Sequence, residues 1–290
     1  MSKFILSAFA DEIDTSLVTQ MDVLEKHDIS HIEMRGVNGK NIVKHTIEEA
    51  KDIKKQLDSK GFKISALGSP IGKINIKEPF EAHLDLFKHT LELAKILDTK
   101  YIRMFSFFMP DKENPEIYKD DVMERWEKFI KAAKGYELTL LHENEKDIYG
   151  DTAERCLDLM ETLKCNYVKA IFDPANFVQC NVETYPYAYK LLKDYIVYFH
   201  IKDALSSNHN VVPSGYGDGK IKEILTEVYN DGFDGFLSLE PHLASFQGFS
   251  ELELEPNSSI NEMPEGGPKQ FAIAADALKK IIYEIRKCGG

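Results

Sequence analysis

The sequence predicts one (β/α)₈ barrel, a fold of the α/β class, spanning residues 1–290. Short runs of β-branched and aromatic residues alternate strictly with longer amphipathic segments, and there are eight of each. Strict alternation implies parallel strands joined by right-handed crossovers. Eight such units in 290 residues fit a closed barrel better than an open sheet. An open sheet normally has a glycine-rich phosphate turn after its first strand, where this chain reads "AFADEIDTS".

The expected strands are short runs with few charges in their centres, at residues 4–9, 31–35, 62–67, 101–107, 138–143, 168–173, 197–202 and 235–240. The expected helices lie between and after them, at about 15–28, 46–60, 79–97, 116–135, 151–164, 185–194, 219–231 and 268–287. The segment 79–97 has the clearest helical period. Its apolar residues recur at three- and four-residue steps with charges on the opposite face, at Phe80, Leu84, Phe87, Leu91 and Ala94.

Composition and charge favour a cytoplasmic enzyme that acts on small molecules. Hydrophobic residues make up 43% of the chain, yet no apolar run approaches the roughly 18 to 20 residues that cross a bilayer. The net charge of −12 repels a phosphate backbone and argues against a nucleic-acid partner. The N-terminus has acidic residues close behind a short apolar run, which favours a first strand over a signal peptide. No CxxC spacing links the four cysteines, which we expect to be free thiols: Cys156, Cys165, Cys180 and Cys288.

The last four expected strands each end on a residue that can bind a divalent cation: Glu143, Asp173, His200 and Glu240. Each residue alone has a simpler interpretation, such as a loop start, a helix N-cap or a buried core histidine. Glu240 is the hardest to explain this way, because a carboxylate at the end of "GFLSL" needs a partner if it is buried. Catalytic groups of such barrels lie at the carboxyl ends of the strands, so we expect one shared metal site.

Three carboxylates and one imidazole form a hard ligand set rich in oxygen. Mn²⁺ suits it best, with Mg²⁺, Co²⁺ and Zn²⁺ as alternatives. Three ionised carboxylates exceed the charge of one dication. The site should therefore accept a neutral polyol or carbonyl compound more readily than a phosphate at the metal.

At this point the chain resembles the xylose-isomerase-like TIM-barrel superfamily, which includes ketose 3-epimerases, hydroxypyruvate isomerase, inosose dehydratase and endonuclease IV. The resemblance runs from "SAFADEID" through "YIRMFSF" and "HENEKDIYGDT" to "FDPANF", "FHIKDA", "VPSGYGDGKI" and "GFLSLEPHL". It implies the barrel fold and a metal held by the four residues named above. It also implies that the protein could form homodimers or homotetramers through its outer helices.

The resemblance also implies catalytic roles for Glu143 and Glu240. In the epimerases the two matching glutamates are both metal ligands and an acid/base pair. A metal that holds a carbonyl and its adjacent hydroxyl favours an enediolate. Two carboxylates on opposite faces of that plane can then remove and return a proton.

Two departures from the family pattern put the substrate in doubt. Many members have a histidine three residues after the strand-six aspartate, where this chain has Asn176. An arginine that many epimerases carry before the Pro-x-Gly-x-Gly segment has no match, and His209 could replace it. The multi-zinc cluster of endonuclease IV needs further histidines that are missing from the ends of strands three and four, "LGSP" and "FSF".

Other side chains are expected at the same mouth of the barrel. Arg103 and Lys202 could bind substrate hydroxyls or balance the acidic cluster, although Lys202 and Asp203 could equally form a local ion pair. Side chains alternate along a strand, so His142, next to Glu143, should point towards the helices and ranks below Glu145. The remaining residues expected there are Glu12, Glu33, Arg35 and His242.

Two loops stand out. Residues 241–267 form a segment too long for a simple connection, and we expect a lid or a subunit contact there. The glycines of "VPSGYGDGKI" predict a tight loop whose backbone shapes the pocket.

Three functions remain open from the sequence. The leading one is a metal-dependent isomerase or epimerase of a small ketose or keto-polyol. A lyase, such as an inosose-type dehydratase or a β-eliminase of 3-keto-glycosides, would begin with the same proton abstraction. The third is a sugar-binding barrel without catalysis. The expected partner is a small sugar, without nucleic acid or membrane.

Overall fold

Eight parallel strands form a closed barrel in the computed structural model, which describes residues 3–246 and 267–288. Going round the barrel, the order is β1-β12-β9-β8-β7-β6-β5-β2. Their bounds are β1 Lys3–Phe9, β2 His31–Met34, β5 Lys63–Leu67, β6 Tyr101–Met104, β7 Thr139–Glu143, β8 Val168–Phe172, β9 Ile196–Ile201 and β12 Asp234–Leu239. The first and last strands close the barrel, since Ser7 pairs with Ser238 and Ala8 with Leu239. The predicted TIM barrel is confirmed.

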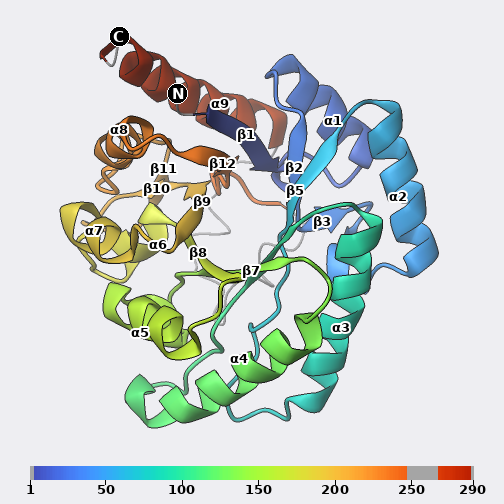
Figure 1. The fold of residues 1–290 in the computed structure, drawn as a ribbon. Coiled ribbons are helices and arrows are strands. Elements are labelled where there is room, and N and C mark those ends of the chain that lie inside the picture. The colour runs from blue at the N-terminus through green and yellow to red at the C-terminus, as the bar shows by residue number, and fades with distance from the viewer. Residues whose placement is uncertain (1–2, 247–266, 289–290) are drawn as a thin grey trace.

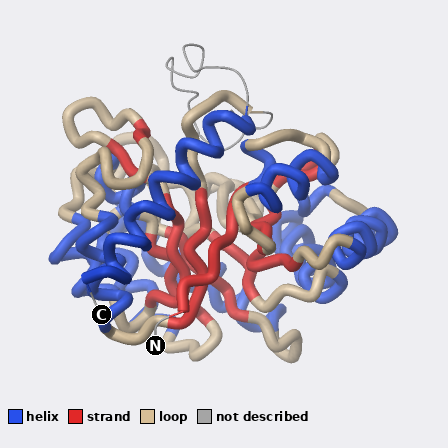
Figure 2. Tube along the Cα trace, turned by 90° about the horizontal axis from the view of Figure 1, so that it is seen from above, coloured by secondary structure: helices blue, strands red, loops and turns tan. Residues whose placement is uncertain are grey.

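Helices surround the barrel on all sides, as Figure 1 shows along the barrel and Figure 2 shows from the side. All eight expected helices are present, within a few residues of the predicted bounds. They are α1 Leu17–Lys26, α2 Ile47–Ser59, α3 Glu81–Ile96, α4 Lys119–Ala133, α5 Ala153–Leu163, α7 Tyr189–Leu192, α8 Ile221–Asn230 and α9 Gly267–Cys288. Five short 3₁₀ or π segments join or extend them: η1 Ala10–Glu12, η2 Ile42–Lys44, η3 Pro115–Tyr118, η4 Tyr149–Asp151 and η5 Thr184–Ala188.

One helix was not predicted. α6 (Pro174–Gln179) starts directly after β8, where the sequence suggested only a turn or a cap. Proline at the first helical position has a backbone angle already suited to a helix, and Asp173 caps the helix by accepting the backbone N–H of Asn176. The start of α6 therefore fixes the backbone conformation of Asp173.

Sequence signals account for the start of α2 and for the buried faces of α3 and α4. Thr46 and Glu49 form a reciprocal capping box at the start of α2. In α4, Trp126 and Phe129 are fully buried, and Phe129 packs edge-on against Phe87 of α3. These helices bury one face each, as their amphipathic patterns predict.

Two small hairpins lie outside the barrel. β3 (Gly36–Val37) pairs with β4 (Lys40–Asn41), and β10 (Asp203–Ala204) pairs with β11 (Val211–Val212). The predicted long loop 241–267 lies mostly outside the described residues, so its role stays a prediction. Within the part of the chain that the structure describes, no helix has both the length and the apolar character of a membrane span.

Candidate metal centre

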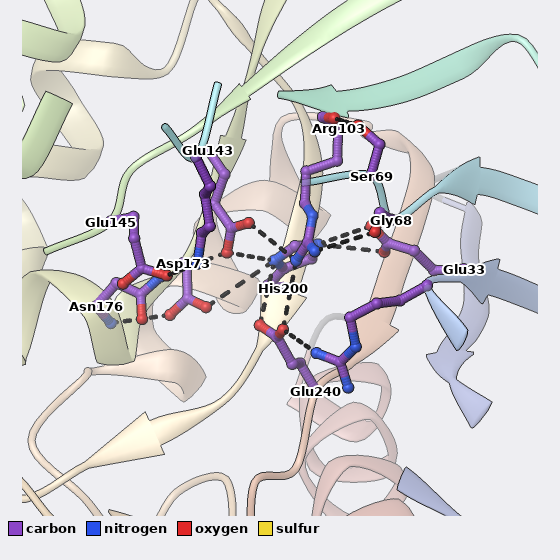
Figure 3. A network of polar contacts seen from close by, with 12 residues as sticks. Glu33, Gly68, Ser69, Arg103, Glu143, Glu145, Asp173, Asn176, His200 and Glu240 are labelled. Atoms are coloured by element: carbon purple, nitrogen blue, oxygen red, sulfur yellow. Dashed lines mark hydrogen bonds and ion pairs between the residues drawn. The ribbon is translucent and has the colours of Figure 1, made fainter. Parts of the chain in front are cut away.

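The four predicted ligands meet at one mouth of the barrel. One ligand atom from each of Glu143, Asp173, His200 and Glu240 lies within 4.8 Å of the others. All four are buried, with exposed fractions of 2% or less. Figure 3 shows the three carboxylates directed at the imidazole ring from separate strand ends. A barrel brings the carboxyl ends of its strands to one face, which is why residues up to 97 positions apart converge here.

One nitrogen of His200 faces the carboxylates. Nδ1 lies 2.8 Å from Oε1 of Glu143, 3.5 Å from Oε2 of Glu240 and 3.9 Å from Oδ2 of Asp173. The other nitrogen, Nε2, points away from them. Burial lowers the pKa of His200, but the carboxylates of Glu143 and Glu33 outweigh it and raise the pKa well above its usual range.

The two oxygens of Asp173 have different tasks. Oδ1 accepts the N–H that caps α6, whereas Oδ2 makes no hydrogen bond to any described residue. Oδ2 has only ionic neighbours, with Nζ of Lys202 at 3.1 Å. Burial raises the pKa of Asp173 to about 7, against the effect of Lys202 and with the help of Glu143. A buried carboxylate oxygen without a donor fits a cation ligand.

The donor set therefore fits a divalent metal ion. It offers three carboxylates and one imidazole nitrogen, all within reach of one centre. Hard oxygen ligands with a single nitrogen suit Mn²⁺ and Mg²⁺, and Co²⁺ or Zn²⁺ can also bind such a set.

Two basic side chains balance the acidic cluster. Nζ of Lys202 lies 3.1 Å from both Asp173 and Glu240, and Arg103 contacts Glu143 at 3.2 Å and Glu240 at 3.4 Å. Burial would raise the pKa of Glu240, but Lys202 and the other cations hold it well below its usual range. The expected counter-charge role is confirmed for both residues.

The alternative of a local Lys202–Asp203 ion pair is wrong. Asp203 is buried and accepts four backbone N–H groups, from Ala204, Gly215, Gly217 and Gly219, at 2.8–3.0 Å. Side chains alternate along β9 and just beyond it, so Lys202 points into the mouth and Asp203 towards the glycine-rich loop.

That arrangement explains the glycines of "VPSGYGDGKI". A Cβ atom on Gly217 would lie 2.3 Å from Oδ1 of Asp203, and one on Gly219 would lie 2.8 Å from it. Only glycine lets the backbone approach the carboxylate this closely. Asp203 therefore anchors the loop beside the metal ligands.

A second group, formed by Glu12, Glu240 and His242, also has the composition of a metal site. Its centre holds the guanidinium of Arg35 instead. Arg35 lies 3.1 Å from Glu12, 3.1 Å from Glu240 and 3.5 Å from Nε2 of His242. Of the two groups found among the described residues, one thus suits a dication and the other is occupied by an arginine.

Burial affects the pKa of Glu12 at this second group. It raises the pKa to about 8, although Arg35 opposes the shift. The carboxyl also accepts the backbone N–H of His242 at 2.7 Å, where His242 adopts a left-handed φ of 46°. Glu12 and His242 are thus fixed beside Glu240.

Of the other residues expected at the mouth, two lie beside the four proposed ligands and one lies beside α6. Asn176 donates to Oε1 of Glu143 at 3.3 Å, and Glu145 lies beside the cluster in an ion pair with Lys73 at 3.1 Å. His209 is placed beside α6, where its ring contacts Asn181 and its carbonyl oxygen accepts from Gln179.

His142 points outwards, as predicted. Its Nε2 contacts Oγ of Ser106 at 2.9 Å, and its ring packs against Trp126 of α4.

Several residues at the mouth were not predicted. The ring of Phe9 lies under both arginines, with guanidinium carbons 4.5 Å (Arg35) and 4.8 Å (Arg103) from its centre. Asn144 forms two hydrogen bonds of 2.9 Å with the backbone of Asp173. Only its position next to Glu143 could have predicted that Asn144 lies at the mouth. Lys73 is on a loop, and no sequence feature predicted its place there.

A comparison with protein-family models assigns most of the chain to one family. The model described as xylose isomerase-like TIM barrel matches residues 21–266. No curated protein sequence matches the chain at a significant level.

Solved structures with the same fold include several enzymes. The D-psicose 3-epimerase from Clostridium cellulolyticum H10, crystallised with D-tagatose, has a TM-score of 0.72 at 14% identity, covering 97% of this chain and 99% of its own. The IolI protein, with a binding zinc atom, has a TM-score of 0.72 at 16% identity, covering 97% and 99%. A probable 3-DHS dehydratase involved in petrobactin synthesis from Bacillus anthracis has a TM-score of 0.68 at 18% identity, covering 82% and 92%. At these identities the likeness shows the fold.

Proposed function

The chain belongs to the xylose isomerase-like TIM barrel family, and from that premise we propose that it is a divalent-metal-dependent isomerase or epimerase of a small ketose or keto-polyol. The observation that carries the proposal is the convergence of Glu143 and Glu240 on one buried imidazole. Two carboxylates of different environment beside a cation site suit the removal and return of a proton at carbon.

Glu143 and Glu240 are proposed as the acid/base pair. They come from β7 and the end of β12, so they approach the cluster from different sides of the mouth. One would take the proton from the carbon next to a carbonyl, and the other would deliver a proton to the opposite face. Both carboxylates contact Arg103, which can compensate their charge as the proton moves.

The metal held by Glu143, Asp173, His200 and Glu240 would polarise the substrate carbonyl and make the neighbouring C–H more acidic. Mn²⁺ is the proposed ion. Because the structural neighbour IolI binds a zinc atom, Zn²⁺ is the first alternative to test.

Substrate hydroxyls are proposed to bind the polar groups around the cluster. Lys202 and Arg103 each contact two of the carboxylates and would stabilise negative charge that develops on substrate oxygens. The further candidates are Glu12, Glu145, Asn176, His209 and His242. The ring of His209 contacts Asn181, just after α6.

Proton exchange in D₂O tests the proposal. The Mn²⁺-loaded protein should interconvert a member of a ketose panel reversibly and introduce deuterium at the carbon that changes, detected by NMR. Glu143→Gln and Glu240→Gln should each lower turnover by roughly 10²-fold or more. Turnover of both variants at the parent rate would refute the acid/base assignment.

The same assay separates the lyase. A dehydratase, the activity named for the Bacillus anthracis neighbour, would consume substrate to an unsaturated ketone that absorbs in the ultraviolet. An epimerase would leave a reversible mixture without that absorption.

A further inference from the structure

Glu33 lies beneath the metal ligands at the centre of the barrel. It stands on β2, is fully buried, and its two oxygens lie 3.2 and 3.1 Å from Nε2 of His200. Figure 3 shows the imidazole of His200 between Glu33 on one side and Glu143 with Glu240 on the other. Glu33 therefore contacts the one ring nitrogen that the ligand cluster does not use.

The carboxylate of Glu33 also belongs to a network of hydroxyl groups inside the barrel. Its Oε2 accepts the hydroxyl of Tyr198 at 2.9 Å, and that hydroxyl also contacts Oγ of Ser65 at 2.9 Å. Ser65 in turn lies 2.6 Å from Oγ of Ser7. These four residues come from β2, β9, β5 and β1, so the network links several strands of the barrel.

Both nitrogens of His200 face carboxylates, Nδ1 those of the ligand cluster and Nε2 that of Glu33, so a metal bound at Nδ1 would leave the ring proton on Nε2. A carboxylate accepts hydrogen bonds and cannot donate one while ionised. The two oxygens of Glu33 lie where they can accept that N–H group. In that state Nε2–H would donate to Glu33, while Nδ1 faces Glu143, Asp173 and Glu240.

We propose that Glu33 is a positioning residue that holds His200 in the Nε2–H tautomer, with Nδ1 aimed into the metal cluster. A carboxylate behind a ligating histidine sets the ring orientation and increases its strength as a ligand. The inference rests on the proposed metal site. It adds a residue from β2 that acts through Nε2 of His200.

Metal affinity tests the role without using turnover. Mn²⁺ binding to the metal-free protein is measured by isothermal titration and by electron paramagnetic resonance of free Mn²⁺. Glu33→Ala should weaken binding about 10- to 100-fold. Glu33→Gln keeps an acceptor oxygen for Nε2–H but loses the charge, and should fall between the parent and the alanine variant.

Tyr198→Phe is the matched control. It removes one buried hydrogen bond from the same network while leaving the carboxylate behind His200. Its Mn²⁺ affinity should stay within a few-fold of the parent's even if its melting temperature falls. If Glu33→Gln and Tyr198→Phe lose stability alike and neither changes Mn²⁺ affinity, Glu33 is only a structural residue and the proposal is overturned.

The tautomer can be read directly in the parent protein. With ¹⁵N-labelled histidine and the diamagnetic Zn²⁺ form, long-range ¹H–¹⁵N spectra should show His200 protonated at Nε2 and metal-bound through Nδ1. Metal bound through Nε2 would overturn the proposal even if no Glu33 variant folds. A parent that binds no metal would instead refute the proposed function, so the two failures are distinguishable.

Discussion

The ammonium group of Lys202 lies 3.1 Å from Oδ2 of Asp173, and Lys202 contacts Glu240 at the same distance. Both partners are proposed metal ligands, and all three side chains are buried. Lys202 thus already balances part of the charge that a dication would balance. Its removal should affect the metal-free protein most.

Lys202→Met should lower the free energy of unfolding in EDTA by about 3–5 kcal/mol, the usual effect of leaving a buried charge without its partner. Saturating Mn²⁺ should restore much of that loss, because the metal then neutralises Asp173 and Glu240. Urea unfolding of the parent and the variant, each with EDTA or Mn²⁺, measures both effects.

Lys73→Met is the control for that experiment. Lys73 pairs with Glu145 at 3.1 Å, beside the cluster. It should lose stability without recovery on adding Mn²⁺. An equal loss for Lys202→Met in EDTA and in Mn²⁺ would contradict the account of its role.

Gly217→Ala should destabilise the protein through a steric clash. A Cβ atom there would lie 2.3 Å from Oδ1 of Asp203 and 2.6 Å from the carbonyl oxygen of Ala204. Gly61→Ala is the comparison, because Gly61 has a positive φ of 73° but open space around it. We expect a loss of about 1 kcal/mol at Gly61 from backbone strain alone, and a clearly larger loss at Gly217. Thermal melts of the two variants decide this, and equal losses would rule out the clash.

His83 on α3 should make stability depend on pH. Its Nε2 accepts the backbone N–H of Gly72 at 2.7 Å, so the ring is neutral in the folded protein. Burial, with a smaller effect of Arg125, lowers the pKa of His83 from 6.5 to about 4. Between these pH values the unfolded chain binds the proton and the folded chain does not, so stability falls as the pH falls.

From pH 7 to pH 5 the His83 contribution amounts to at most about 2 kcal/mol. Urea unfolding at both pH values should therefore show a larger loss for the parent than for His83→Gln, which cannot titrate there. The same loss in both proteins would show that His83 does not have the lowered pKa.

The sequence was sufficient for the barrel and for its four proposed ligands. Alternation of strands and helices is a local property, and it gave all eight strands. Polar residues at strand ends are also visible locally, which is how Glu143, Asp173, His200 and Glu240 were found. Helix α6 was missed because it has only six residues, too few for a periodic signal.

Contacts across the barrel could not be predicted in the same way. Glu33 and Arg35 were expected at the mouth, but β2 gives no sign that Glu33 would meet His200, or that Arg35 would fill the group of Glu12 and His242. These contacts depend on the stagger between strands, which the hydrogen-bond register sets. The choice between Asp203 as an ion-pair partner and as a loop anchor likewise needed the path of the loop.

The most direct test of the central claim is the metal content of the purified protein after reconstitution with Mn²⁺ and removal of the excess. Among the residues that the structure describes, one group suits a dication and the other holds Arg35, so the parent should retain about one equivalent, and Asp173→Asn much less. A parent that retains less than about 0.1 equivalent would contradict the four-ligand site, since a preformed cluster of this kind should hold its metal.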